Sequence, residues 1–166
     1  MQLPRYLSAG VLLLLSAIAT AQPQQGYIAE FACEEGPFGL HLPGHLPAVM
    51  KLAPAKRVAV LEVEKWEGYT TTRKYVYFEG LTIGLVTFSN DRNRYMVSFA
   101  EITDPRWTRI SPFKVGETTV SARKKIGSPA GKDPSLKLHY GSEGGDIYFE
   151  IVGGRIRKIT YDCYTG

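Results

Sequence analysis

Cysteine is scarce in this chain, which has 166 residues and two cysteines, Cys33 and Cys163. The two are not spaced as Cys-x-x-Cys, so the sequence lacks a dithiol redox motif. Histidine is scarce as well, and His41 and His45 flank Pro43-Gly44. That dipeptide disfavours the helix that would bring both imidazoles to one metal ion. No glycine-rich phosphate loop is present, and we expect neither a metal ion nor a cofactor.

Strong net charge is also missing. The chain has 20 lysines and arginines against 16 aspartates and glutamates, a formal charge of +4. So mild an excess does not indicate a nucleic-acid partner. The basic clusters are Arg123-Lys124-Lys125 and the group of Arg155, Arg157 and Lys158. We expect them to lie on a solvated face, the alternative being attraction to an acidic partner or an anionic envelope surface.

Long apolar runs are absent except near the start of the chain. Arg5 precedes an apolar run over 7–19, and small residues follow at Ala19 and Ala21. This pattern predicts a secretory signal peptide over 1–21, cleaved after Ala21, and the run is short for a membrane span. An uncleaved N-terminal anchor is the alternative. No cysteine follows the cleavage point directly, so we expect no lipid anchor. The predicted protein is exported, periplasmic or secreted, and has no transmembrane segment after cleavage.

Export bears on the two cysteines, because an oxidising compartment favours disulfide bonds. A Cys33–Cys163 bridge would close a loop of about 130 residues and stabilise the fold by about 4–5 kcal/mol in the chain-entropy model. Unlinked thiols are the alternative. Residues 22–166 have the length of a single domain with its own core.

Alternation of apolar and polar residues predicts a mainly antiparallel β structure. The alternating segments are 58–66, 70–78, 81–88, 94–102, 136–140, 147–151 and 156–161. A short helix is expected near Leu46–Leu52 and a second over Val120–Ile126, which Gly127 and Pro129 would end. The predicted fold class is therefore α+β, an antiparallel sheet with one or two short helices packed on one face.

The two halves of the chain resemble each other. Pro37-Phe38 matches Pro112-Phe113, and Pro54-Ala55 matches Pro129-Ala130 at the same offset. The strands that follow match only at a shorter offset, which leaves room for one extra strand in the first half. This predicts a tandem repeat of a helix-plus-strands unit, over residues 36–104 and 111–163. The alternative is a single meander in which these dipeptides are ordinary loop residues.

The second half carries a pattern of known type. It begins Phe113-Lys114-Val115-Gly116-Glu117-Thr118, continues through a short helix to Ile126-Gly127-Ser128-Pro129, and is followed by three predicted strands. This resembles the unit of the SmpA/OmlA and β-lactamase-inhibitor-protein-like superfamily, most clearly over residues 112–163. The resemblance implies a non-enzymatic protein-binding module that docks through an open sheet face. The chain departs from the pattern in having no lipobox and a proline-broken first unit.

A coherent catalytic set is missing, and we expect a protein that is not an enzyme. Ser121 and Lys124 match Ser-x-x-Lys, but the companion Ser-Asp-Asn and Lys-Thr-Gly motifs are absent. Glu143 and Asp146 straddle a glycine pair and are candidates for a carboxylate pair, while His139 stands alone on a predicted strand. A small exported hydrolase that uses Glu143, Asp146 or His139 is the alternative.

Aromatic side chains on the predicted strands indicate binding. If Leu61 and Val63 face the core, strand parity turns Trp66 outward, and the same rule applies to the later strands. The candidate residues on the outward sheet face are Trp66, Tyr75, Tyr77, His139 and Tyr148. Rings that only cover the edge of the core are the alternative.

These observations predict an exported, soluble module that binds another exported protein. Its most concrete version is an inhibitor or immunity protein of a secreted or periplasmic hydrolase. An envelope-assembly or small-ligand-binding protein is a second candidate, and the small hydrolase is a third.

Overall fold

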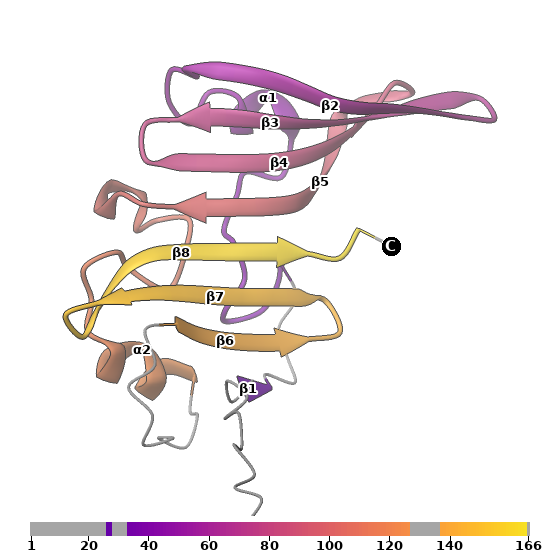
Figure 1. Ribbon diagram of the computed structural model, residues 1–166. Coiled ribbons are helices and arrows are strands. Elements are labelled where there is room, and N and C mark those ends of the chain that lie inside the picture. Colours follow the sequence, from indigo (N-terminus) through magenta and orange to yellow (C-terminus); the bar gives the residue numbers. More distant parts are fainter. Residues whose placement is uncertain (1–25, 28–32, 127–136, 166) are drawn as a thin grey trace, which may run out of the picture.

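The chain forms one large β-sheet with short helices in the computed structural model, which describes residues 26–27, 33–126 and 137–165 (Figure 1). The predicted signal peptide lies outside the described residues. The elements are β1 (Gly26–Tyr27), α1 (Leu46–Val49), β2 (Arg57–Trp66), β3 (Tyr69–Phe78), β4 (Leu81–Phe88), β5 (Asp91–Ile102), the 3₁₀ helix η1 (Pro105–Trp107), α2 (Thr119–Ile126), β6 (Lys137–Ser142), β7 (Gly145–Val152) and β8 (Arg155–Cys163). The expected antiparallel sheet is confirmed, and with so few helices the fold is α+β or mostly β.

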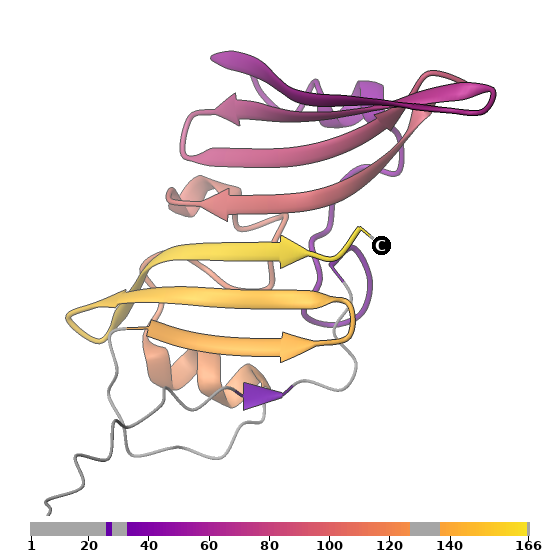
Figure 2. The same ribbon diagram turned by 45° about the vertical axis from the view of Figure 1, so that its right-hand side comes forward.

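The order of the strands divides the sheet into two halves. It is β1-β6-β7-β8-β5-β4-β3-β2, and every neighbouring pair is antiparallel except β1 with β6. The last strand of the first half, β5, pairs with the last strand of the second half, β8 (Figure 2). On one side of this junction lie β5, β4, β3 and β2. On the other side lie β8, β7, β6 and the two-residue strand β1. A duplicated unit with one extra strand would give this topology, and the duplication itself stays a prediction.

Element positions follow the alternation of the sequence closely. The strands β2, β3 and β4 begin and end within one residue of the expected ranges. The next strand, β5, starts at Asp91 rather than at residue 94, because the turn is only Ser89-Asn90 and Phe88 pairs with Asp91. Pro47 lies in the first turn of α1, which is shorter than expected, and α2 contains the expected Val120–Ile126.

One face of the sheet carries the hydrophobic core. Leu81, Ile83 and Leu85 alternate along β4 and are each at most 2 % exposed. Val49 of α1 and Ala122 of α2 are fully buried in the same cluster. This burial anchors both short helices, which are too short to be stable by hydrogen bonding alone.

The other face, here called the open face, carries the residues that alternate with the core positions. Cross-strand pairing assigns to it, from β3 to β6, Tyr75, Tyr77, Thr82, Gly84, Val86, Phe99, Glu101, Lys158, Thr160, Asp162, Asp146, Tyr148, Glu150 and His139. None of the buried hydrophobic residues of the core belongs to this set among the described residues. The sheet is therefore apolar on one face and mixed in polarity on the other.

The edge strand β2 departs from the sequence expectation. Leu61 and Val63, which parity assigned to the core, are 52 % and 56 % exposed. The reason is position: β2 is the outermost strand, and its hairpin with β3 extends past the ends of the neighbouring strands (Figures 1 and 2). Alternation in sequence reports which residues share a face of a strand, but burial also needs a second layer above that strand.

A disulfide bond joins Cys33 to Cys163, as the two cysteines predicted. It ties the segment before α1 to the end of β8 across 130 positions of sequence. No helix within the described ranges is long and apolar enough to cross a membrane.

Candidate functional site

The open face brings four of the five predicted binding residues into two adjacent rows. Directly opposed residues run from His139 through Tyr148, Thr160, Glu101 and Thr82 to Tyr77, one on each of six strands. The neighbouring row runs from Asp146 through Asp162, Phe99 and Gly84 to Tyr75. His139 and Tyr77 thus mark the ends of one row, roughly 24 Å apart at the usual strand spacing.

An aromatic group, here called the tyrosine cluster, occupies the β3 end of these rows. Tyr75 contacts Phe99 with ring centroids 5.5 Å apart and Tyr77 edge-on at 6.1 Å. The guanidinium of Arg57 lies 4.5 Å from the centre of the Tyr77 ring. These contacts hold the large rings in place before any partner binds. Little side-chain entropy is then lost on binding, which makes the rings suitable contact residues.

Gly84 is what allows the tyrosine cluster to form. It lies on the open face between Tyr75 and Phe99. A Cβ atom there would come within 2.7 Å of the Tyr75 ring and 2.9 Å of Phe99 Cβ. The absence of a side chain therefore lets the Tyr75 ring lie close over β4.

A second group, here called the histidine cluster, occupies the opposite end. His139 Nε2 lies 2.7 Å from Asp146 Oδ1, and the Tyr164 hydroxyl donates to Asp146 Oδ2 at 2.6 Å. The His139 ring stacks on Tyr148 with centroids 4.3 Å apart. Desolvation, with the nearby Asp146 carboxylate, raises the pKa of the Tyr148 phenol, and the hydrogen bond to Asp146 raises the pKa of Tyr164.

Charged side chains lie between the two clusters. Lys158 forms ion pairs with Glu101 at 3.3 Å and Glu150 at 3.4 Å. The adjacent Glu101 carboxylate is the main reason that the pKa of Lys158 is raised. The middle of the open face is thus polar and the two ends are aromatic.

Trp66 stands apart from both clusters. It lies at the end of the β2–β3 hairpin, 55 % exposed, where its ring stacks on Tyr69 at 6.3 Å and its indole N–H donates to Thr71 Oγ1 at 3.2 Å. Tyr69 also contacts Phe88 with tilted rings, and the Arg94 guanidinium lies over the Phe88 ring. Trp66 therefore shares the face of the other candidates but not their location.

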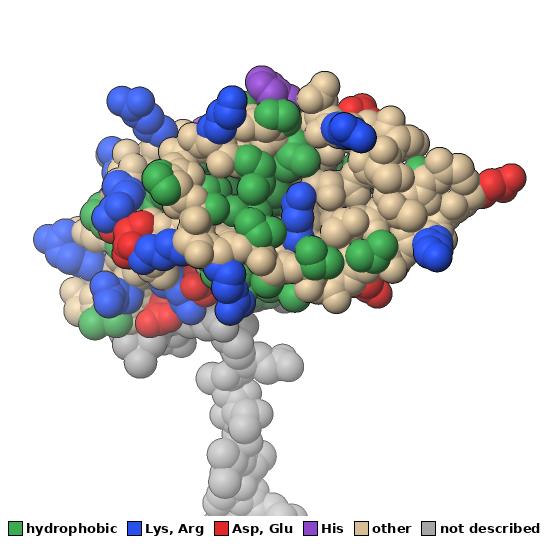
Figure 3. All heavy atoms as spheres, turned by 90° about the horizontal axis from the view of Figure 1, so that it is seen from above, with side chains coloured by type: hydrophobic (Ala, Val, Ile, Leu, Met, Phe, Trp, Pro, Cys, Tyr) green, Lys and Arg blue, Asp and Glu red, His purple; other side chains and the backbone are tan. Residues whose placement is uncertain are grey.

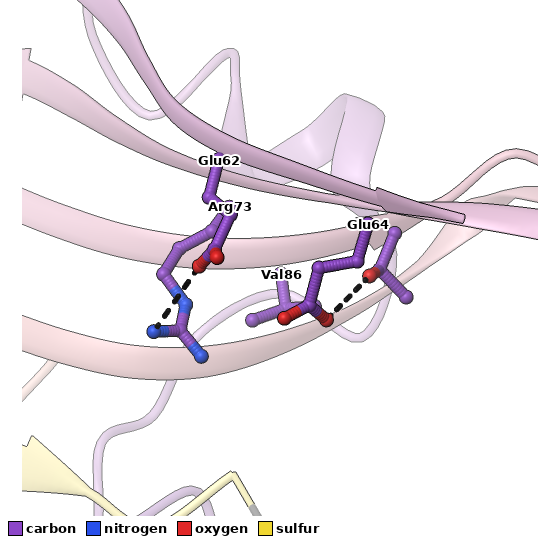
Figure 4. A pocket seen from close by; sticks show the side chains of 5 residues that line it. Glu62, Glu64, Arg73 and Val86 are labelled. Atoms are coloured by element: carbon purple, nitrogen blue, oxygen red, sulfur yellow. Dashed lines mark hydrogen bonds and ion pairs between the residues drawn. The ribbon is translucent and has the colours of Figure 1, made fainter. Parts of the chain in front are cut away.

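The open face also holds a small pocket between β2, β3 and β4, shown in Figure 4. Arg73 pairs with Glu62 across it at 3.9 Å, and the Thr71 hydroxyl donates to Glu64 at 3.4 Å. Its volume of about 20 Å³ has room for about one water molecule.

A larger hollow of about 540 Å³ lies at the turn from β3 to β4, beside Trp107. The charged side chains that line it are already paired, Lys56 with Glu79 and Arg106 with the adjacent Asp104. The hollow therefore offers a ligand no unsatisfied charge among the described residues.

The structure places the candidate catalytic residues in different surroundings. His139 and Asp146 are brought together, whereas Glu143 lies exposed in the β6–β7 turn. The His139–Asp146 pair has the geometry that orients an imidazole for proton transfer. The phenols of Tyr148 and Tyr164 contact this pair, Tyr148 by stacking on His139 and Tyr164 by its hydrogen bond to Asp146.

The Ser-x-x-Lys match is engaged in a separate contact network. The Ser121 hydroxyl donates to Glu117 Oε2 at 3.2 Å, and the Lys125 ammonium forms an ion pair with the same oxygen at 2.7 Å. This serine thus faces a carboxylate near the start of α2 and lies in a different element from the His139–Asp146 pair.

Some site residues were outside the reach of sequence reasoning. Phe99 was missed because a bulge at Ser98 shifts the alternation of β5, and the bulge leaves no mark in the sequence. Tyr164 was missed because it follows the last strand, where no parity applies. Gly84 in the middle of an alternating strand was the available signal for a close approach.

Comparisons with family models, with curated proteins and with solved structures gave no match for this chain. No group of three or more possible metal ligands occurs among the residues that the structure describes.

Proposed function

We propose that this protein is an exported protein-binding module that docks another exported protein on its open face. The observation that carries the proposal is the pair of rows on that face, with an aromatic cluster at each end and ion pairs between them. Binding surfaces commonly combine large, held aromatic rings with a charged or polar surround. The most concrete form is an inhibitor or immunity protein of a secreted or periplasmic hydrolase.

The resemblance of residues 112–163 to the SmpA/OmlA and β-lactamase-inhibitor-protein-like superfamily supports the same proposal. In both halves of the chain a short helix precedes antiparallel strands, as a repeat of that unit would require. The core-facing side chains Val49 and Ala122 would then each anchor the helix of one unit, although they are not matched positions of the repeat. A non-catalytic role is what the resemblance implies, whereas the expected solubility comes from the predicted signal peptide and the absence of a lipobox.

Site-specific photocrosslinking tests the proposal. A benzophenone amino acid is placed at Tyr77, at Tyr148 or, as a control, at Val120 of α2, which is 75 % exposed and away from the open face. We expect the same protein to be captured from envelope extract at Tyr77 and Tyr148 but not at Val120. Equal capture at all three positions, or at none, would contradict docking on the open face.

The purified partner then allows a quantitative test. Tyr75→Ala combined with Tyr77→Ala removes the tyrosine cluster, and we expect the dissociation constant to rise about 30-fold, the effect of losing about 2 kcal/mol at a hot spot. Val120→Ala is the matched control and should leave binding unchanged. If the partner is a hydrolase, adding the wild-type module should lower its turnover, and the double variant should do so only at higher concentration.

A second candidate function rests on the 2.7 Å contact of His139 with Asp146. A small exported hydrolase could use this pair as base and orienting carboxylate. His139→Ala should then abolish turnover of a cell-wall or ester substrate, whereas Tyr77→Ala should not. Equal turnover by wild type and His139→Ala would exclude this role.

A further inference from the structure

The edge formed by β2 has features that the open face does not explain. Nine of its ten residues pair with β3 along one side, and the described residues offer no partner strand on the other. Natural edge strands are usually short, broken by proline, bent by a bulge, charged or covered, and of these β2 has a bulge and charged side chains. β2 contains no proline, and its one lysine, Lys65, lies next to the hairpin end.

Exposed aliphatic side chains are concentrated on this edge. Val58, Val60 and Val63 are 47 %, 61 % and 56 % exposed. In Figure 3, which looks down on this edge, hydrophobic side chains gather across the middle of the surface, and charged ones are most frequent to their left. Aliphatic residues on a free strand edge favour addition of another strand.

A bulge in the middle of β2 determines which of its side chains share a face. Val60 pairs with Lys74 but Glu62 pairs with Arg73, so Leu61 is an extra residue and the alternation shifts by one there. Pairing with β3 consequently places Arg57 and Glu64 together on the open face. It also places Val58 and Val63 together on the core side. In a regular strand the members of either pair would face opposite sides, because they are an odd number of residues apart.

We propose that two copies of this protein associate by antiparallel pairing of their β2 strands, about a two-fold axis that passes between Val60 and Leu61. Directly opposed residues have side chains on the same face of a sheet. In this register Arg57 of each copy opposes Glu64 of the other, and Val58 opposes Val63. The interface then contains two ion pairs and two valine pairs.

Other registers are poorer. Moving the axis to lie between Leu61 and Glu62 keeps the faces matched, but sets Lys65 against Val58 and leaves Glu64 opposite Ala59. An axis through Val60 or through Leu61 sets core-side residues opposite open-face residues. An antiparallel ladder does not allow this, because directly opposed side chains lie on the same face. Charge and face together therefore select the register with Arg57 opposite Glu64.

The pairing would join two sheets into one, with both open faces on the same side, because a two-fold axis normal to the sheet preserves the faces. Each copy would keep its own tyrosine cluster exposed beside the other. The proposal concerns the edge and does not depend on the proposed function of the open face.

Charge reversal tests the association by sedimentation of the purified protein with its disulfide intact. Wild type should dimerise in the micromolar to millimolar range, and Arg57→Glu or Glu64→Arg alone should raise the dissociation constant by about tenfold or more, since each sets two like-charge pairs face to face. An equimolar mixture of the two variants should form heterodimers, because each then supplies the charge that the other lacks. That recovery also shows that both variants are folded. A monomeric wild type, or a dimer indifferent to both reversals, would overturn the proposal.

Cysteine crosslinking tests the register. Val58→Cys and Val63→Cys should form an intermolecular disulfide when the two variants are mixed, since directly opposed residues lie within disulfide reach. Either variant alone should not crosslink, because position 58 of one copy would be roughly 17 Å from position 58 of the other. Crosslinking of each variant with itself, or failure of the mixture to crosslink, would rule out this register.

Discussion

The hydroxyl of Tyr161 is a single buried group that joins distant segments of the chain. It lies 2.9 Å from Ser111 Oγ and donates to the Phe38 carbonyl at 3.2 Å. Ser111 Oγ in turn accepts the Phe113 N–H at 3.1 Å. Tyr161 is fully buried, and its desolvation raises the pKa of the phenol.

Removing that hydroxyl should weaken the fold. Tyr161→Phe keeps the ring but leaves the Phe38 carbonyl and Ser111 with unmet hydrogen bonds, and we expect the free energy of unfolding to fall by about 1–3 kcal/mol. Urea denaturation measures the loss. Tyr75→Phe, on the open face, is the control and should change stability by about 0.5 kcal/mol or less. If Tyr161→Phe lowers the free energy of unfolding no more than Tyr75→Phe does, the buried network contributes no stability of its own.

At the scale of elements, α2 is held at its start by Thr118. Thr118 Oγ1 accepts the backbone N–H of Ser121 at 3.2 Å, the N-cap arrangement that satisfies one of the free donors of a helix start. The basic residues Arg123, Lys124 and Lys125 lie in the last turn, where the helix dipole favours positive charge. With eight residues, α2 depends on these end contacts and on the burial of Ala122.

Loss of the cap should cost measurable stability. Thr118→Ala removes the accepting oxygen, and we expect the free energy of unfolding to fall by about 1 kcal/mol in a denaturant titration. Thr118→Ser retains the oxygen and should stay within a few tenths of a kcal/mol of wild type. A serine variant as unstable as the alanine variant would mean that the threonine methyl, and not the cap, is what matters.

Elements were predictable where local chemistry decides them. Alternation located β3 and β4, and the helix expected over Val120–Ile126 begins one residue earlier in α2. The bulges at Leu61 and Ser98 were not predictable, because either strand could be regular with the same residues. Since a bulge inverts the parity that follows it, the face of Phe99 depended on a feature that the sequence does not mark.

At the scale of the molecule, the candidate site depends on long-range pairing. His139 and Tyr77 fall in one row only because β5 pairs with β8. The sequence predicts the strands on each side, but strand order follows from burial of both halves on one core, which no local pattern specifies. The aromatic residues were therefore identifiable in advance, and their division into two separate clusters was not.

The disulfide acts at this same scale, because the loop that it closes contains nearly all the described residues. With a sequence separation of 130, the chain-entropy model gives a stabilisation of about 5 kcal/mol through the unfolded state. The total stability of a domain is about 5–15 kcal/mol, so reduction should remove a large share of it. Cys33→Ala combined with Cys163→Ala should have the same effect as reduction of the wild-type protein.

Thermal and urea unfolding of the oxidised, reduced and double-alanine proteins measures this loss. We expect the oxidised protein to unfold at clearly higher urea, and the other two to coincide, because both lack only the covalent link. A difference between these two would assign part of the effect to the packing of the cysteine side chains, which are 8 % and 6 % exposed. If all three proteins unfold together, the unfolded chain gains no freedom from reduction, and the link between the two ends of the sequence is dispensable for the fold.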